Sequence, residues 1–150
     1  MKERMSNEEI LQGFLSKDAH KIITSSHEVI HSVITDRSHI EALYPHLGEI
    51  KKATQGISYG GTILPNQRFV DKALKVIEDS VKPDCLCKYS FDDFGQSVQM
   101  LEKVGFEVHS EKTENYVTTG EIECPLCHQR YIVEEEFTGW HVTSSRHRAI

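Results

Sequence analysis

The chain has 150 residues, of which 38% are hydrophobic and 27% are charged, a composition typical of globular proteins rather than disordered or fibrous ones. A chain of this length buries enough apolar surface to form its own core, so we expect any metal or disulfide chemistry to be local. The net charge of −6 argues against binding to nucleic acid or to anionic lipid through charge alone.

The first residues and the hydropathy of the chain favour a cytoplasmic location. Residues 1–9 are mostly charged or polar and lack the apolar run of a secretory signal. No apolar stretch approaches the ~20 residues that a membrane-spanning helix needs. We therefore expect a soluble cytoplasmic protein without a membrane partner. Its four cysteines should stay reduced there, and serve as metal ligands or redox groups rather than as disulfides.

Two helix starts are visible near the N-terminus. Ser6 and Glu9 have the spacing of a capping box, which predicts a first helix that ends at about Leu15. Asp18 is expected to cap a second helix, because apolar residues recur at helical spacing behind it. This second helix should end near Asp36.

Further helices are predicted in the middle of the chain. One is expected over Leu43–Ile50, interrupted at Pro45, and another opens at residues 65–66 with an apolar face behind it. A last short helix is expected at residues 98–104.

From Lys82 onward the sequence favours short β segments, which we expect to form a small antiparallel sheet. The acidic charge is concentrated there: residues 81–150 carry seven Lys or Arg and twelve Asp or Glu. The predicted fold class is α+β. A helical part (1–81) is expected to pack on a metal-stabilised β part (82–150), and the two parts should form one compact unit. The expected strands contain Val108, Val117, Ile122, Val133 and Val142.

The four cysteines form two close pairs, Cys85/Cys87 and Cys124/Cys127, and four thiolates fill the tetrahedral shell of zinc. The second pair, with Pro125 inside it, lies between expected strands near Ile122 and Tyr131. It would then form the knuckle of a zinc-ribbon-like hairpin. We predict one structural Zn²⁺ held by all four cysteines.

Other interpretations of the cysteines remain open. A redox Cys-x-x-Cys should open a helix, whereas residues 129–133 favour a strand. Cys124–His128 matches the haem c attachment pattern, but that chemistry takes place outside the cytosol and leaves the first pair unexplained. The cysteines could also be small apolar core residues. Either His128 or His109 could replace one sulfur as a ligand.

His27-Glu28-x-x-His31 resembles the zinc-binding helix of zincin metallopeptidases, in which two histidines one turn apart bind zinc and the glutamate activates water. The resemblance covers five residues and departs from the metzincins, which place Gly and a third His where Ile34 and Arg37 stand. We favour the interpretation that these histidines flank a helix contact, and a proton-sensitive pair is a further alternative. A zinc hydrolase is therefore an alternative function.

Two charged segments close the chain. Residues 140–148 hold a Trp and two Arg, and we expect a frayed terminus there rather than a nucleic-acid contact, which would need a basic stripe. The Glu134–Glu136 run is interpreted as a solvated strand edge.

The sequence shows no complete catalytic constellation, so we expect a protein that is not an enzyme. The expected function is an acidic, zinc-stabilised protein-interaction module of inhibitor or immunity type, which covers a basic surface of an unidentified protein partner. The alternatives are the zinc hydrolase and a nucleic-acid-binding zinc ribbon. The sequence determines neither the partner nor the oligomeric state.

Overall fold

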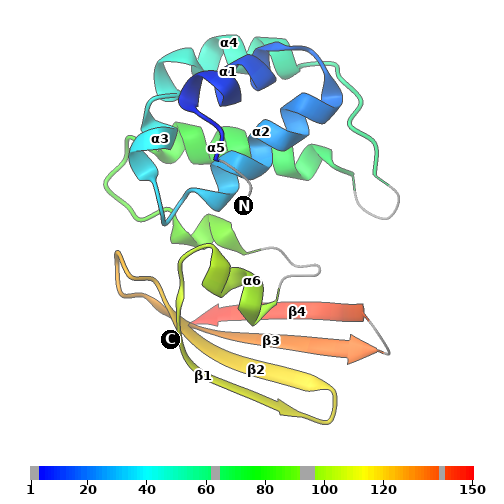
Figure 1. Ribbon diagram of the computed structural model, residues 1–150, viewed down its shortest axis with the longest axis vertical. Coiled ribbons are helices and arrows are strands. Elements are labelled where there is room, and N and C mark those ends of the chain that lie inside the picture. The colour runs from blue at the N-terminus through cyan, green and yellow to red at the C-terminus, as the bar shows by residue number, and fades with distance from the viewer. Residues whose placement is uncertain (1–3, 62–64, 92–96, 139–140) are drawn as a thin grey trace. The chain divides into compact units, whose positions relative to one another are not determined.

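A computed structural model describes residues 4–61, 65–91, 97–138 and 141–150 (Figure 1). The chain divides into two compact units, Met1–Leu86 and Cys87–Ile150, which are described separately below. Within the described residues, no helix combines the length and the apolar character needed to cross a bilayer.

The first unit is a bundle of short helices. Helix α2 packs against both α1 and α5, and α1 also packs against α4 (Figure 1). The elements are α1 (Asn7–Leu15), α2 (Ala19–His31), α3 (Arg37–Glu41), the 3-10 turn η1 (Tyr44–His46), α4 (Leu47–Thr54) and α5 (Gln67–Asp79).

The predicted helix starts are confirmed at their caps. The Ser6 hydroxyl accepts from the Glu9 amide at 3.2 Å, and the Asp18 carboxylate accepts from the Lys21 amide at 3.0 Å. The predicted end of the second helix was wrong, because α2 ends at His31. Asp36 instead caps α3, where its carboxylate accepts the His39 amide, so it starts a new helix rather than ending the old one.

The core of this unit is mainly aliphatic and aromatic, with the fully buried serines Ser25 and Ser26 among the apolar side chains. Helices α1 and α2 approach closely at Gly13, where an added Cβ would lie 2.1 Å from the Ser25 Oγ. The buried Ser25 hydroxyl is satisfied because it donates to the Ile10 carbonyl at 2.9 Å. Residues with no exposed surface include Ile10, Phe14, Ile22, Ile40, Ile50, Val70, Val76 and Ile77.

Arg37 holds the segment that follows α5. Its guanidinium donates to the carbonyl of Ser80 at 2.9 Å and to that of Asp84 at 2.8 Å, and it also contacts the carbonyl of Lys82. Three carbonyls that no helix satisfies therefore meet one planar donor group. This contact fixes the stretch of chain that leads to Cys85.

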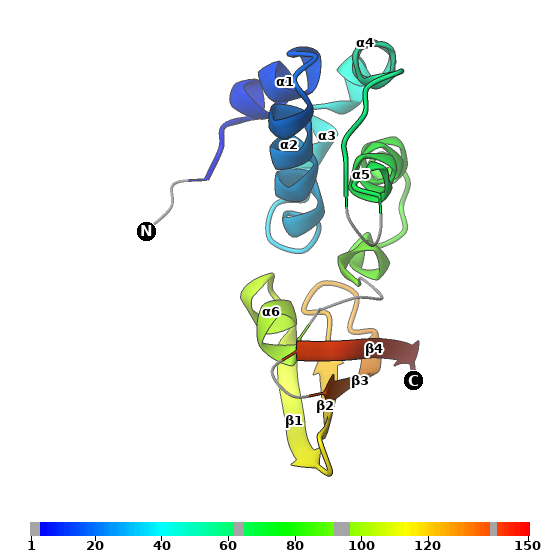
Figure 2. The same cartoon turned by 90° about the vertical axis from the view of Figure 1, so that its right-hand side faces the viewer.

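The second unit is a four-stranded sheet with one helix on it. Its strands pair antiparallel in the order β1-β2-β3-β4, and α6 lies over the β1–β2 side (Figure 2). The predicted α+β class and the antiparallel sheet are confirmed. The elements are the 3-10 turn η2 (Cys87–Ser90), α6 (Val98–Lys103), β1 (Glu107–Glu114), β2 (Val117–Glu123), β3 (Arg130–Thr138) and β4 (His141–Ala149).

Two predictions about the end of the chain were wrong. Residues 141–149 form strand β4 rather than a frayed terminus, and Trp140 lies outside the described residues. Because β4 pairs with β3, the Glu134–Glu136 run lies in an interior strand and not at an edge. Side chains alternate along β3, so Glu135 is buried while Glu134 and Glu136 are exposed.

Candidate metal centre

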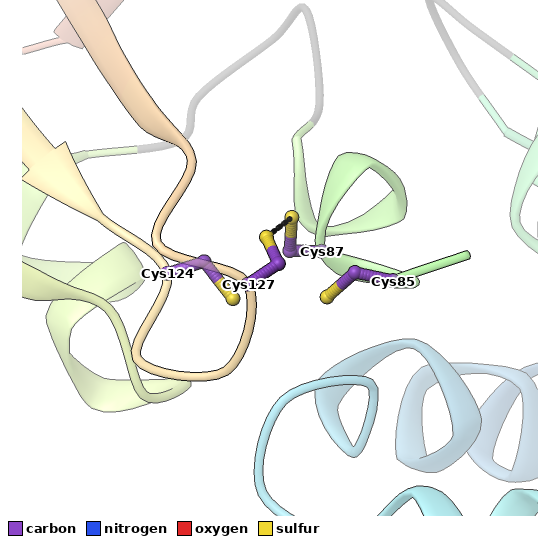
Figure 3. Close-up of side chains that lie close together, drawn as sticks. All are labelled: Cys85, Cys87, Cys124 and Cys127. Atoms are coloured by element: carbon purple, nitrogen blue, oxygen red, sulfur yellow. Dashed lines mark hydrogen bonds between the residues drawn. The ribbon is translucent and has the colours of Figure 1, made fainter. Parts of the chain in front are cut away.

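The four cysteines come from two short segments that meet in space (Figure 3). Cys124 and Cys127 belong to the turn that joins β2 to β3. Cys87 is the first residue of η2, and Cys85 lies two residues before it on the same stretch of chain. Sequence positions about forty residues apart thereby supply one cluster of thiols.

The spacing of the sulfurs fits a tetrahedral metal ion. All four Sγ atoms lie within 4.8 Å of one another, and the Cys87 and Cys127 sulfurs are 3.6 Å apart. A disulfide would require about 2.05 Å, and all four cysteines are free. Four thiolates about 2.3 Å from one zinc ion stand about 3.8 Å apart, a separation close to the observed one. The cluster could therefore hold a metal ion.

The turn that carries the second pair is fixed by its own backbone. The His128 amide donates to the Cys124 carbonyl at 2.9 Å, and the Cys124 amide donates to the Gln129 carbonyl at 3.0 Å. His128 adopts a left-handed conformation with φ of 64°, a region that favours glycine. These bonds and Pro125 shape the turn, and its two sulfurs lie within 4.8 Å of each other (Figure 3).

Tyr131 lies next to the sulfurs on β3. Its hydroxyl is 3.2 Å from the Cys87 Sγ, and it donates when that sulfur is a thiolate. Burial raises the pKa of the Tyr131 phenol well above its ordinary value, and the hydrogen bond and charge of Cys87 act in the same direction. Tyr131 is thus a permanent donor to a sulfur that would ligate the metal.

The surroundings of the cluster differ from one side to the other. Cys87 and Cys124 are buried, Cys85 is half-buried and Cys127 is exposed. The Tyr131 ring also packs on Phe91, whose centroid is 4.6 Å away. Aromatic side chains therefore shield one side of the cluster, while a metal could reach the other from solvent.

His109 and His128, the possible substitute ligands, contact a carboxylate instead of joining the cysteine cluster. His109 and His128 both contact the Glu123 carboxylate, at 3.3 and 3.4 Å, and Arg130 donates to the same carboxylate at 3.0 Å. These contacts lower the pKa of Glu123, with Arg130 the largest cause. Glu107, His109 and Glu123 form a second group of close potential ligands, but Arg130 already neutralises its central carboxylate.

The His27-Glu28-x-x-His31 helix is not completed into a metal site. Among the described residues, no third potential ligand is grouped with these side chains. The His27 ring instead packs on Phe69, with ring centroids 4.5 Å apart. The centroids of the His27 and His31 rings are 5.8 Å apart. Burial lowers the pKa of His31, while the charge of Glu28 opposes this shift.

Sequence reasoning missed the chemistry of Glu135. This residue is only 2% exposed, and its carboxylate accepts the backbone amide of Val98 at the start of α6. Burial raises the pKa of Glu135, and the nearby charge of Glu111 adds to the rise. The alternation of Tyr131, Val133 and Glu135 on one face of a strand is the signal that could have revealed it.

Comparison with known protein families, with characterised proteins and with solved structures gave no match. The class of protein is therefore defined by the structure itself: an α+β protein with a cluster of four free cysteines.

Proposed function

We propose that this protein is a zinc-stabilised protein-interaction module, in which Cys85, Cys87, Cys124 and Cys127 hold one zinc ion at a zinc-ribbon-like knuckle. The observation that carries the proposal is the set of four sulfurs within 4.8 Å of one another. Thiolate ligands favour zinc over magnesium, calcium or manganese. A reducing compartment such as the cytoplasm keeps the thiols available for the metal.

The zinc has a structural role in this proposal. Four thiolates close the tetrahedral shell, so no position is left for a water molecule or a substrate. Zinc in such a site contributes on the order of 10–16 kcal/mol of apparent binding energy, which becomes folding energy when the site exists only in the folded protein. The protein then acts through its surface rather than as an enzyme.

The charge of the second unit supports a basic protein partner. Residues 87–150 carry six Lys or Arg and eleven Asp or Glu, a net charge of −5. Such a surface attracts a basic partner and repels nucleic acid, which disfavours the nucleic-acid-binding alternative. Inhibitors and immunity-type proteins that cover a basic site have this kind of charge.

Metal analysis tests the site directly. The reduced protein should bind one zinc per chain by elemental analysis, and Co²⁺ in its place should give the visible spectrum of tetrahedral sulfur coordination. Cys124→Ser should abolish stoichiometric binding. Leu126→Ala is the matched control, because this exposed side chain lies in the same turn and offers no ligand. Reduced protein that binds no zinc would overturn the proposal.

The partner is tested with the zinc-loaded protein as bait. We expect nuclease-treated lysate to yield a basic protein that is retained in the presence of zinc and lost from the Cys124→Ser bait. Recovery of nucleic acid alone, or of no stable partner, would contradict the interaction function. Two zinc ions per chain, with hydrolysis lost in Glu28→Gln, would favour the hydrolase instead.

A further inference from the structure

The second unit contains a pocket of about 860 Å³ between the start of α6 and the β1–β2 hairpin. Its size falls within the roughly 300–1,000 Å³ typical of small-ligand sites. The pocket is separate from the cysteine cluster, and nothing about it depends on the identity of the metal. Its lining includes Glu111, Thr113, Tyr116, Thr118 and Glu135.

The strand register explains why these side chains face one cavity. Thr113 pairs with Thr118, which pairs in turn with Glu135, so the three form one row across β1, β2 and β3. Glu111 pairs with Gly120 in the neighbouring row of the same face. Paired residues on adjacent strands point to the same side of a sheet.

Gly120 lets α6 pack closely on the sheet beside the pocket. A Cβ built there would lie 2.7 Å from Val98 Cγ2, so the absent side chain lets the first turn of α6 approach the strands. Val98 in turn donates its amide to the Glu135 carboxylate. The helix and the sheet therefore hold Glu135 in place at the wall of the pocket.

The charge of this pocket is uncompensated. Within the described part of the chain, neither Glu111 nor Glu135 forms an ion pair, and the hydrogen bond to Glu135 comes from the neutral backbone amide of Val98. Among the described residues that line the pocket, none is Lys, Arg or His. A carboxylate that is 98% removed from solvent and lacks a counter-charge is costly, because burial penalises its charged form.

The other lining groups, two threonine hydroxyls and a tyrosine ring, can also contact a cation. Thr113 and Thr118 hydroxyls lie 2.8 Å apart and offer lone pairs beside the carboxylates. The Tyr116 side chain, 76% exposed, stands at the rim with its aromatic ring available for stacking on a cation. A cation would therefore meet carboxylates inside and an aromatic ring at the entrance.

We propose that this pocket binds the guanidinium or ammonium end of a ligand, with Glu135 as its buried counter-charge and Glu111 as a second one nearer to solvent. The ligand carries a protonated amine or guanidine on an alkyl chain. It is either a free amine or an Arg or Lys side chain presented by a polypeptide. Charge-assisted hydrogen bonds to the carboxylates and hydroxyls supply the recognition.

The test uses the full-length, metal-loaded protein and amide NMR. Capped arginine (Nα-acetyl-arginine amide), capped lysine and agmatine are titrated, and the neutral isostere Nα-acetyl-citrulline amide is the control ligand. The cations should shift the amides of residues 111–118 and Gly120 and leave those of α2 and α5 unchanged. Equal shifts with citrulline, or none with any cation, would overturn the proposal.

Variants then locate the counter-charges. Glu135→Gln should weaken binding about tenfold or more, because it removes the charge of a buried acceptor. Glu111→Gln should weaken it about two- to fivefold, as expected for an exposed pair, and does not threaten the fold. Glu114→Gln is the matched control on the same hairpin, since that carboxylate pairs with Lys112 and does not line the pocket.

The same titration distinguishes the two sources of the cation. Tighter binding of the capped amino acids than of agmatine assigns the pocket to a polypeptide side chain, whereas the reverse assigns it to a free amine. Unchanged affinity in both Glu135→Gln and Glu111→Gln would show that the carboxylates do not bind the ligand, and would refute the proposal.

Discussion

The two units of this protein are stabilised by different means. The helical unit buries a large set of aliphatic side chains, and its buried polar atoms include the hydroxyl of Ser25, bonded to a carbonyl. The sheet unit is shorter, and it buries a carboxylate and two cysteines among few apolar residues. Domains of about 60 residues bury a smaller fraction of their surface and gain more from a bound metal. Three of the four clustered cysteines, Cys87, Cys124 and Cys127, belong to this shorter unit.

Metal removal should separate the two units most clearly. If zinc supplies on the order of 10–16 kcal/mol to the folded site, chelation should abolish hydrogen-exchange protection in β2 and β3. The amides of α2 and α5 should keep theirs, because their core contains no metal ligand. Protection that survives unchanged in the sheet would contradict this division.

A core truncation should give the opposite pattern. Ile22→Ala removes a side chain with no exposed surface and should cost the helical unit about 2–5 kcal/mol. Chemical denaturation monitored by helical circular dichroism measures this loss, while zinc content should remain that of the parent protein. Lys21→Ala, on the exposed face of the same helix, controls for the substitution itself.

Tyr131→Phe should weaken the metal site without unfolding the sheet. The variant loses the hydroxyl that contacts the Cys87 sulfur and keeps the ring that packs on Phe91. We expect zinc affinity to fall about 10- to 100-fold, as for other groups that support metal ligands. Competition with a chelator measures it, and an equal fall in the exposed Tyr116→Phe would contradict the role of the hydroxyl.

Glycine substitutions should affect the two units unequally. Gly120→Ala forces a methyl group against Val98 and should destabilise the sheet unit by about 1–3 kcal/mol. Gly48→Ala meets no atom within 4 Å in α4 and should stabilise the helical unit by up to about 1 kcal/mol. Thermal unfolding of the zinc-loaded proteins compares them, and equal signs would contradict the packing at Gly120.

The smallest effect is expected at a helix cap. Asp18→Ala removes the acceptor for the Lys21 amide and should cost about 1 kcal/mol, confined to the helical unit. Asp18→Asn keeps an acceptor oxygen at the same place and should restore most of this loss. A denaturation midpoint that is equally low in both variants would assign the effect to charge rather than to capping.

Local signals in the sequence predicted much of this fold. Ser6 and Asp18 start helices because their side chains satisfy amides three residues ahead, an interaction that depends on the local chain alone. The two cysteine pairs predicted a cluster because two close pairs of reduced thiols have the spacing of metal ligands. These predictions needed no knowledge of which segments meet in space.

Long-range pairing explains the errors. The Glu134–Glu136 run resembles an exposed edge until β4 is known to pair beside it. Glu135 then becomes an interior residue. It pairs with Thr118 on β2, and its carboxylate accepts the amide of Val98 at the start of α6. The end of α2 was missed for a similar reason, since Asp36 could either end one helix or begin the next. Tertiary contacts determine which of the two structures forms in each case.

Arg37 shows how the chain leaves α5 without a glycine. Helices commonly stop at a glycine whose left-handed backbone turns the last carbonyls toward new donors, whereas α5 is followed by Ser80 in a right-handed conformation. The Ser80 and Lys82 amides satisfy the Ile77 and Asp79 carbonyls locally, and an arginine 43 residues earlier in the chain donates to the Ser80 carbonyl that follows them. Lysine could not replace it, because a single ammonium lacks the flat, forked shape needed to serve several carbonyls at once. The path of the chain after this helix therefore depends on a residue in a distant part of the sequence.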